Sequence, residues 1–398
     1  MMWTRVGLLW LTLSALFISG CGKESEPAAG AAAPQQTFEW QMVTTWPRNY
    51  PGLGMAPENF AKAVNAMSGG RLKVKVHGAG ELVPAMGVFD AVARGAVQMG
   101  HGAAYYWKGK TPAAQFFTAV PFGMNAQEMN GWLHYGGGME LWREVYEPFN
   151  LVPFAGGSTG VQMAGWFKQE INSVADLKGL KMRIPGLAGE VFQRLGGVPV
   201  TLPGGELFTA LQTGSIDATE WVGPYNDLTF GLYRAADYYY YPGWHEPGAM
   251  LEFIVNKDAW ESLPPDLQAI VKYATRAVNQ DMLDEYTARN NAALKELVEK
   301  HGVQLRKLPD DVVAALRQAS REVIQETIAE DEMARKVYES FQAFKTDVAP
   351  YTAISEDAFL EIREQSAAPA GSASSDADAS SSSDSSSSSG SGSSSGSP

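Results

Sequence analysis

A short stretch near the middle of the chain places the firmest limit on the fold. The apolar residues Leu180, Met182 and Ile184 alternate there with Lys181 and Arg183. Successive side chains of a strand point to opposite faces, so a strand that buries the apolar set turns the basic set the other way. A Pro-Gly pair then ends the strand. The pattern predicts a basic side chain at the carboxyl end of a strand, where open α/β sheets place their ligands.

Strand-like and helix-like segments alternate along most of the chain. Short apolar runs predict strands, and apolar residues at helical spacing predict helices. The predicted strands cover 38–45, 72–76, 96–100, 151–155, 161–167, 180–184, 198–200, 218–221 and 253–256. The predicted helices cover 58–68, 88–94, 190–195 and 206–213, with a helical turn at 173–177 and long helical stretches at 265–300 and 310–344. This order predicts an α/β fold, with helices on both faces of a parallel sheet.

The composition limits the class of partner and the number of domains. The chain has 398 residues, with 31 Lys and Arg against 44 Asp and Glu, and a formal net charge of −13. It has no block of basic residues, so nucleic acid is not an expected partner. The roughly 330 residues between the two ends suffice for two lobes. We expect lobe I to begin with 38–160, lobe II to cover 161–250, and 251–365 to return to lobe I and supply C-terminal helices.

The N-terminal sequence is typical of export. An apolar run follows Arg5 and ends shortly before Cys21, which is the single cysteine of the chain. The run is too short for a comfortable membrane span, so residues 1–20 are expected to be a signal peptide. The four residues ending at Cys21 resemble a bacterial lipobox, which implies lipidation of that cysteine and anchoring to a membrane. A plain signal peptide with an incidental cysteine is the alternative.

Both ends of the mature chain lack core-forming residues. Residues 21–37 are mainly Ala, Pro, Gly and small polar residues, and 366–398 are almost entirely Ser, Gly, Ala and Asp. Such segments bury too little apolar surface to offset the entropy of ordering. We therefore expect a lipidated tether at the N-terminus and a disordered Ser-rich tail at the C-terminus.

Four motifs in combination resemble one transporter family. They are the segments 69–72, 99–101, 178–183 and 212–218. Together with the order of predicted elements, they resemble the solute-binding proteins of TRAP transporters, over residues 40–364. The resemblance implies a periplasmic two-lobe clamshell with hinge strands and a long helix lying across both lobes. It also implies TRAP membrane subunits as partners and cation-driven uptake, while dimers built through the C-terminal helices occur in the relatives the chain most resembles.

The resemblance gives Arg183 a ligand role. A guanidinium can hold a carboxylate through two parallel hydrogen bonds, which suits a small organic acid as ligand. The run 103–110 is closer to family members that bind small 2-oxo acids than to those that bind sialic acid or C4-dicarboxylates. A 2-oxo or 2-hydroxy monocarboxylate is therefore the expected ligand.

A second group of residues predicts a cation at the site. Typical members carry an asparagine after the 212–218 turn, where this chain has Glu220 and Trp221. A glutamate beside a carboxylate ligand would repel it unless a cation lay between them. Oxygen atoms of Gln162, Glu220 and the Trp221 carbonyl suit Na⁺ or Ca²⁺, and the oxo-acid-binding branch is similar in using such a cation. Glu246 is a further candidate ligand. The alternative is that Glu220 pairs with a nearby Lys or Arg.

Three aromatic residues are candidates for the wall of the ligand site. Trp46, Tyr105 and Tyr106 could line it or donate hydrogen bonds to the ligand, and ordinary packing is the alternative for each.

An enzyme is the rival class. Residues 156–160 match the Gly-x-Ser-x-Gly pattern of a hydrolase nucleophile at Ser158, with His245 and His301 downstream. The nucleophile must open a helix, whereas 161–167 is predicted to be a strand. His245-Glu246 lacks the second histidine that a zinc protease motif needs. These patterns favour a binding protein over an enzyme, and a secreted hydrolase using Ser158 is kept as the alternative.

Overall fold

The structure is a computed structural model that describes residues 36–365. The predicted signal peptide, Cys21, nearly all of the tether and the C-terminal tail lie outside the described residues. Within 36–365, no helix has both the length and the apolar character that a membrane crossing requires.

The first sheet has five strands and is mixed. Its order is β2 (Leu72–His77), β1 (Phe38–Thr44), β3 (Met99–Gly102), β10 (Met250–Asn256) and β4 (Leu151–Ser158). Strand β1 is parallel to β2 and β3, whereas β10 is antiparallel to β3 and β4. The predicted parallel arrangement is confirmed for β1, β2 and β3, and the sheet becomes mixed where β10 enters it. The chain re-enters this sheet at β10 after forming five strands of the second sheet, and it does so in the opposite direction.

The second sheet has six strands and is also mixed. Its order is β11 (Gln304–Lys307), β9 (Tyr238–Tyr241), β5 (Gly165–Phe167), β8 (Ala218–Thr219), β6 (Lys181–Arg183) and β7 (Val198–Val200). Strand β5 is antiparallel to both of its neighbours, and the other pairs are parallel. We call the parts built on the five- and six-stranded sheets lobe I and lobe II. The predicted lobe boundaries at 161 and 251 stay predictions.

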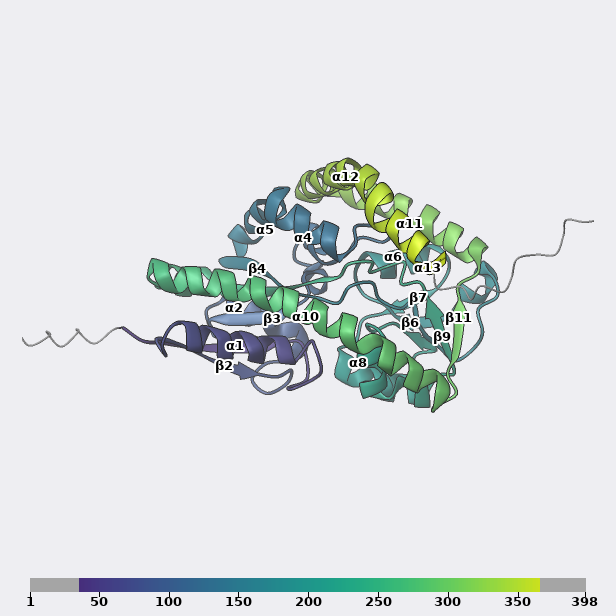
Figure 1. Cartoon of the computed structure of the whole chain (residues 1–398), viewed down its shortest axis with the longest axis horizontal. Helices are drawn as coiled ribbons and strands as arrows, with labels where there is room; N and C mark the ends of the chain where they lie inside the picture. Colours follow the sequence, from purple (N-terminus) through teal and green to yellow (C-terminus); the bar gives the residue numbers. More distant parts are fainter. Residues whose placement is uncertain (1–35, 366–398) are drawn as a thin grey trace, which may run out of the picture.

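Helices surround the two sheets, and one of them joins the lobes. The α-helices are α1 (Met55–Met67), α2 (Val88–Ala93), α3 (Gln115–Thr118), α4 (Ala126–Tyr135), α5 (Gly138–Tyr146), α6 (Gly186–Arg194), α7 (Leu207–Thr213), α8 (Pro224–Phe230), α9 (Lys257–Glu261), α10 (Pro265–Glu299), α11 (Asp310–Glu330), α12 (Glu332–Thr352) and α13 (Ala358–Gln365). Helix α10 has 35 residues and runs across the whole molecule (Figure 1). It packs against α1 and β4 in lobe I and against α8 in lobe II. This confirms the predicted two-lobe α/β fold with a long spanning helix.

Two connecting segments cross between the sheets side by side. They cover 159–164 and 242–249, and we call them the crossing segments. The Thr159 amide donates to the Ala249 carbonyl at 3.1 Å, and the Gln162 amide donates to the Glu246 carbonyl at 3.1 Å. Gly243 permits this approach, because a Cβ atom there would lie 2.1 Å from the Gln162 carbonyl oxygen. The strand predicted over 161–167 is thus shorter, with only 165–167 in β5.

The C-terminal helical stretch predicted over 310–344 is two helices. Asp331 separates α11 from α12 with an extended backbone (φ −133°, ψ 117°). Its carboxylate accepts a hydrogen bond from the Ala334 amide, which caps the start of α12. The apolar pattern continues through the break, so periodicity alone did not reveal it.

Candidate functional site

Arg183 lies at the carboxyl end of β6 with its side chain fully buried. Nε donates to the Leu202 carbonyl at 3.1 Å, and Nη2 donates to the Tyr106 hydroxyl at 3.1 Å. Nη1 donates to the Glu220 carboxylate. The guanidinium carbon is 5.2 Å from the centroid of the Trp221 ring, a distance typical of a cation–π contact. Because Tyr106 follows β3 and the other partners belong to lobe II, this arginine lies where the lobes meet.

Glu220 directly follows β8, and its side chain is also fully buried. One carboxylate oxygen pairs with Arg183. The other lies 3.5 Å from His245 Nε2 and has no hydrogen-bond partner among the described residues. The alternative in which Glu220 pairs with a basic side chain is therefore seen in the structure, and the basic side chain is the predicted ligand anchor itself.

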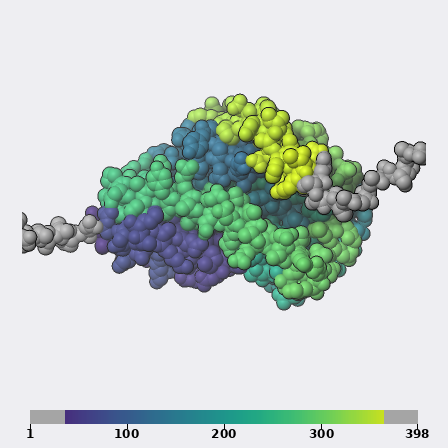
Figure 2. Space-filling model, in the orientation of Figure 1, coloured from purple at the N-terminus to yellow at the C-terminus, as the bar shows by residue number. Residues whose placement is uncertain are grey.

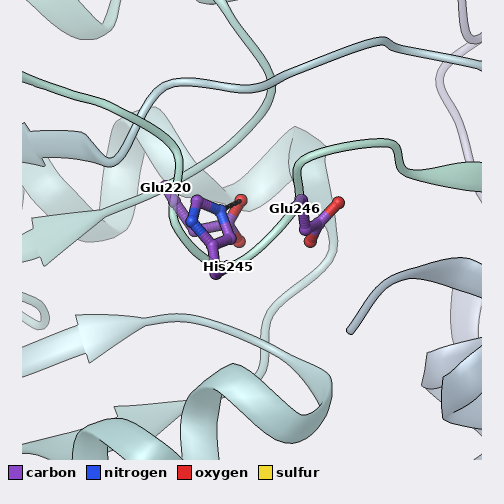
Figure 3. A group of neighbouring side chains, drawn as sticks. All are labelled: Glu220, His245 and Glu246. Atoms are coloured by element: carbon purple, nitrogen blue, oxygen red, sulfur yellow. Dashed lines mark ion pairs between the residues drawn. The ribbon is translucent and has the colours of Figure 1, made fainter. Parts of the chain in front are cut away.

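The crossing segments bring three further polar side chains to Glu220. Gln162 lies on the first segment, and His245 and Glu246 lie on the second. Gln162 Nε2 donates to a Glu246 carboxylate oxygen at 2.8 Å and to Thr159 Oγ1 at 3.1 Å. Figure 3 shows His245 beside Glu220. Glu246 lies on the segment that carries His245, and Glu220 lies on a different segment. Ligand atoms of Glu220, His245 and Glu246 all lie within 4.8 Å of one another.

Several buried polar atoms of this group lack partners. They are Gln162 Oε1, one oxygen of Glu220, and both ring nitrogens of His245. Buried polar atoms normally have partners, and each one without a partner costs about 1–3 kcal/mol. No described residue donates a hydrogen bond to the Trp221 carbonyl oxygen. This donor set fits a hard cation such as Na⁺ or Ca²⁺, although the His245 nitrogens add a softer ligand than the predicted oxygen set.

The electrostatics of the site favour a bound cation. Burial and then the charge of Glu220 raise the pKa of Glu246 well above its ordinary value. Burial acts to lower the pKa of Arg183, but the charge of Glu220 together with Tyr106, Tyr105 and Glu246 outweighs it and raises that pKa above its ordinary value. Arg183 is thus a permanent cation facing two carboxyl groups. A second positive charge would let both carboxyl groups ionise.

Of the three predicted aromatic residues, only Tyr106 is hydrogen-bonded to Arg183. The Trp46 indole N–H donates to His101 Nδ1 at 2.8 Å, so it is engaged by another side chain. The Trp46 ring meets the Trp221 ring edge-on, with centroids 6.0 Å apart. Tyr106 accepts from Arg183, as described above. Burial and then the charge of Glu246 raise the pKa of Tyr105 well above its ordinary value, which places this phenol near the same carboxyl group.

Contacts between the lobes close over this group. Gly186, at the start of α6, has φ +64°, and a Cβ atom there would lie 3.2 Å from Tyr105 Cβ. Lys108 Nζ lies 2.7 Å from a carboxylate oxygen of Glu190 on α6. These contacts join residues that follow β3 to the helix that follows β6, so the structure shows the lobes closed on each other.

The geometry of a hydrolase is absent at Ser158. This serine ends β4 and is fully buried, and its Oγ accepts a hydrogen bond from the Gly160 amide. The next element is β5 rather than a helix, so no nucleophile elbow forms. His301 lies at the far end of α10, where its ring stacks on Tyr233. The hydrolase alternative is therefore not supported.

The sequence prediction missed His245 as a member of the site. It was considered there only as a triad or zinc histidine. The available signal was its position directly before Glu246 in a Gly-Trp-His-Glu-Pro-Gly segment, which is rich in turn residues.

Known proteins match both the sequence and the fold. Residues 42–331 match the family described as bacterial extracellular solute-binding protein, family 7. The chain is 45% identical over 336 residues to a monocarboxylate 2-oxoacid-binding periplasmic protein of Nostoc sp., a match that covers 84% of this chain and 91% of the relative.

Two crystal structures of TRAP solute-binding proteins are similar to this one. That from Pseudoalteromonas atlantica has bound sodium and pyruvate; it is 46% identical with a TM-score of 0.80, covering 82% of this chain and 99% of the other. That from Bordetella bronchiseptica is a mixed-occupancy dimer with co-purified calcium and picolinate; it is 37% identical with a TM-score of 0.82, covering 84% of this chain and 99% of the other. The chain therefore belongs to family 7 of the bacterial extracellular solute-binding proteins, the periplasmic solute receptors of TRAP transporters.

Proposed function

We propose that this receptor binds a small 2-oxo or 2-hydroxy monocarboxylate together with Na⁺ or Ca²⁺, and delivers the acid to TRAP membrane subunits. The observation that carries the proposal is the enclosed group of Arg183, Glu220, Gln162 and His245, in which a fixed positive charge faces unpaired polar atoms. The Nostoc relative, named for 2-oxoacid binding, and the pyruvate and picolinate of the two similar crystal structures support this ligand class.

Arg183 is the proposed anchor of the ligand carboxylate. Its guanidinium is charged at all physiological pH values and can present two parallel N–H groups. Tyr106 holds one end of the guanidinium at 3.1 Å, and the Leu202 carbonyl holds Nε at 3.1 Å. These contacts fix the plane of the fork before the ligand arrives. Tyr105, Trp46 and the Trp221 ring are the proposed wall around the ligand.

The cation is proposed to be held by Gln162 Oε1, Glu220, the Trp221 carbonyl and Glu246, with His245 beside them. When bound, it would supply positive charge that both the ligand oxygens and the carboxylates can share. A ligand carboxylate that draws on the charge of Arg183 leaves Glu220 with less of its counter-charge. The cation would replace that loss, so ligand and cation should bind together rather than independently.

Closure of the lobes is proposed to complete the site. Tyr105 and Tyr106 approach from lobe I, and Arg183 and Glu220 belong to lobe II. Separation of the lobes would expose both sets to water and would weaken every ionic contact between them and the ligand. The closed form is the state that the membrane subunits would recognise.

Calorimetry of the ligand-stripped protein tests the ligand class. Pyruvate, lactate and longer 2-oxo acids would be titrated in buffer that contains Na⁺ and Ca²⁺, with succinate and sialic acid as controls. The proposal expects saturable binding of at least one 2-oxo or 2-hydroxy monocarboxylate and weaker or absent binding of the controls. If none of the monocarboxylates binds, the ligand class is wrong.

We also propose that Cys21 carries a lipid that anchors the receptor to a membrane.

We further propose that the chain forms a homodimer through its C-terminal helices. Apolar side chains lie exposed from the end of α12 through α13: Tyr351 (73%), Ile354 (76%), Phe359 (54%), Leu360 (40%) and Ile362 (61%). So much exposed apolar surface at one end of a chain is typical of a contact with another copy or partner. The dimer of the Bordetella bronchiseptica protein supports a second copy as that partner.

A further inference from the structure

A hollow in lobe I, away from the carboxylate site, gathers basic side chains. It has a volume of about 120 Å³ and lies between α4, α5, β4 and α10. Its polar lining comes from His134, Glu140, Arg143, Lys272, Thr275 and Arg276, and its apolar lining includes Met139 and Phe154. In Figure 2 the chain around α4 and α5, in blue, meets the green band of α10 on this face of the molecule. The basic residues come from two distant parts of the sequence, 134–143 and 272–276, so only the fold brings the two groups together.

The positive charges around this hollow are poorly compensated. Lys272 and Arg276 lie one turn apart on α10, and neither has a carboxylate oxygen within 4.0 Å among residues 36–365. Lys272 lies over the ring of Tyr273 and Arg276 over the ring of Tyr135. Arg143 reaches only Glu140, at 4.0 Å. In a chain of net charge −13, with more acidic than basic residues, such a group is unexpected.

His134 adds hydrogen-bonding capacity without adding charge. Burial, followed by the charges of Arg276 and Arg143, lowers the pKa of this imidazole to about 4. The ring is therefore neutral near pH 7 and can donate one hydrogen bond. Three cations against the single carboxylate of Glu140 leave the lining with a net positive charge, and an anion that enters the hollow reduces the repulsion among the cations.

The volume of the hollow limits the size of the ligand that it can hold. A volume of about 120 Å³ suits a small oxyanion, whereas a nucleotide or a peptide segment requires a site of several hundred Å³. Guanidinium groups bind tetrahedral oxyanions well, because each can present two N–H groups to two oxygens. We propose that this hollow is a binding site for a small, multiply charged oxyanion, phosphate or sulfate, distinct from the carboxylate site at Arg183.

Occupation of this site would couple elements of lobe I. An anion held by Arg143 and Arg276 links α5 to α10. The same part of α10 carries Asn279, whose Nδ2 donates to Asn130 on α4 at 2.7 Å and whose Oδ1 accepts from the Gly157 amide at 3.0 Å. Gly157 lies in β4, two residues before the first crossing segment begins. The bound anion would thus brace the side of lobe I from which that segment leaves.

Titration calorimetry with inorganic phosphate tests the proposal. The protein would be kept saturated with pyruvate at fixed sodium concentration and ionic strength, so that the carboxylate site is filled and screening is constant. We expect saturable binding of one phosphate. The double variant Lys272→Gln, Arg276→Gln should bind phosphate about tenfold or more weakly, because charged hydrogen bonds are lost. Lys295→Gln, on the same helix and 67% exposed at its side chain, is the matched control and should bind phosphate normally.

A phospholipid headgroup carries the same phosphate group as free phosphate. A second experiment distinguishes a lipid ligand from a free anion. Co-sedimentation with phosphatidylglycerol vesicles would be compared with phosphatidylcholine vesicles, for the wild type and the double variant. Binding to the anionic vesicles that is lost in the double variant, without saturable phosphate binding, identifies a headgroup as the source.

Absence of binding in both arms overturns the proposal, as does phosphate or vesicle binding that the double variant leaves unchanged. Pyruvate affinity, measured on the same samples, reports separately on the carboxylate site and on folding. It should be unchanged in the double variant.

Discussion

Arg183 and Glu220 form an ion pair in which both side chains are wholly buried. Such a pair contributes little net stability, because desolvation of the two charges offsets most of their attraction. Removal of one partner is costly, however, since the other charge is then buried alone. We therefore interpret the pair as a preformed binding site. Arg183 would bind the ligand carboxylate and Glu220 would bind the cation, each in place of part of their contact with one another.

The first prediction concerns the anchor. Arg183→Ala should weaken binding of the monocarboxylate by about 2–5 kcal/mol, since a buried charged contact is lost and the ligand carboxylate is left unpaired. Calorimetry measures the change. Arg194→Ala is the control, because this exposed arginine on α6 pairs with Glu322 and Glu326 on α11, far from the site.

Loss of folding would obscure that result. Thermal melting of each variant checks it, and Arg183→Lys keeps the charge beside Glu220 while removing the planar fork. A loss of less than about tenfold in affinity for a folded Arg183→Ala protein would rule out the anchor role, since tenfold is roughly 1.4 kcal/mol.

The second prediction concerns a buried carboxyl group in lobe I. Glu252 on β10 accepts hydrogen bonds from Trp107 at 2.5 Å and from Tyr146 at 2.8 Å. Burial raises its pKa from 4.5 to about 7. The folded protein therefore takes up a proton between pH 8 and pH 5 that the unfolded chain does not, and its stability should rise as the pH falls through this window and fall again as the pH rises.

Urea unfolding at pH 8 and pH 5 measures this effect. Between these two pH values the wild type should gain on the order of 2 kcal/mol more stability than Glu252→Gln, which cannot titrate. The comparison with this variant matters because burial also raises the pKa of Asp227 to about 7, and that group contributes equally to both proteins. Equal pH dependence in the two proteins would show that Glu252 does not titrate in this range.

The third prediction concerns the anchor to the membrane. Cys21→Ser removes the thiol that lipidation requires and should release the receptor into the soluble periplasmic or culture fraction. Ligand affinity should not change, because Cys21 is not among the residues proposed to hold the ligand or the cation. Fractionation followed by immunoblotting measures the distribution, and retention of the variant in detergent-extractable membranes would refute the lipobox interpretation.

The fourth prediction concerns the dimer. The double variant Ile354→Ser, Phe359→Ser removes two of the exposed apolar side chains at the C-terminal end, and it should shift the protein from dimer to monomer. Sedimentation equilibrium measures the mass. Tyr135→Ser is the control, since this side chain is 84% exposed but lies on α4. If the wild type sediments as a monomer at all concentrations, the dimer proposal fails.

The strand-and-helix order was predictable because local patterns carry it. The alternation around Arg183 predicted β6, and Lys181 on that strand is exposed as expected. Arg183 was expected to point away from the apolar face, and it is buried because Tyr106 and Glu220 cover that face. Sequence spacing determines which side chains of a strand share a face. Whether that face is buried depends on segments that are distant in sequence.

Features that depend on two distant segments were not predicted. The antiparallel direction of β10 follows from the chain's return from lobe II. His245 joins Glu220 because the second crossing segment passes beside β8, and neither residue indicates the other in sequence. Helices α4 and α5 were also missed. The capping box of Asn125 and Glu128 at the start of α4 was an available signal.

Ligand and cation should bind as one coupled pair through Glu220, and cation-controlled calorimetry measures that coupling. Monocarboxylate affinity would be measured in rigorously chelated, sodium-free buffer and again with Na⁺ or Ca²⁺ added, for the wild type and for Glu220→Gln. Removal of cations should weaken binding to the wild type, and addition of either Na⁺ or Ca²⁺ should restore it. Glu220→Gln should bind weakly with little response to cations. Wild-type affinity that is unchanged without cations, or binding that becomes tighter in Glu220→Gln, would contradict this coupling and would leave Glu220 as a partner of Arg183 alone.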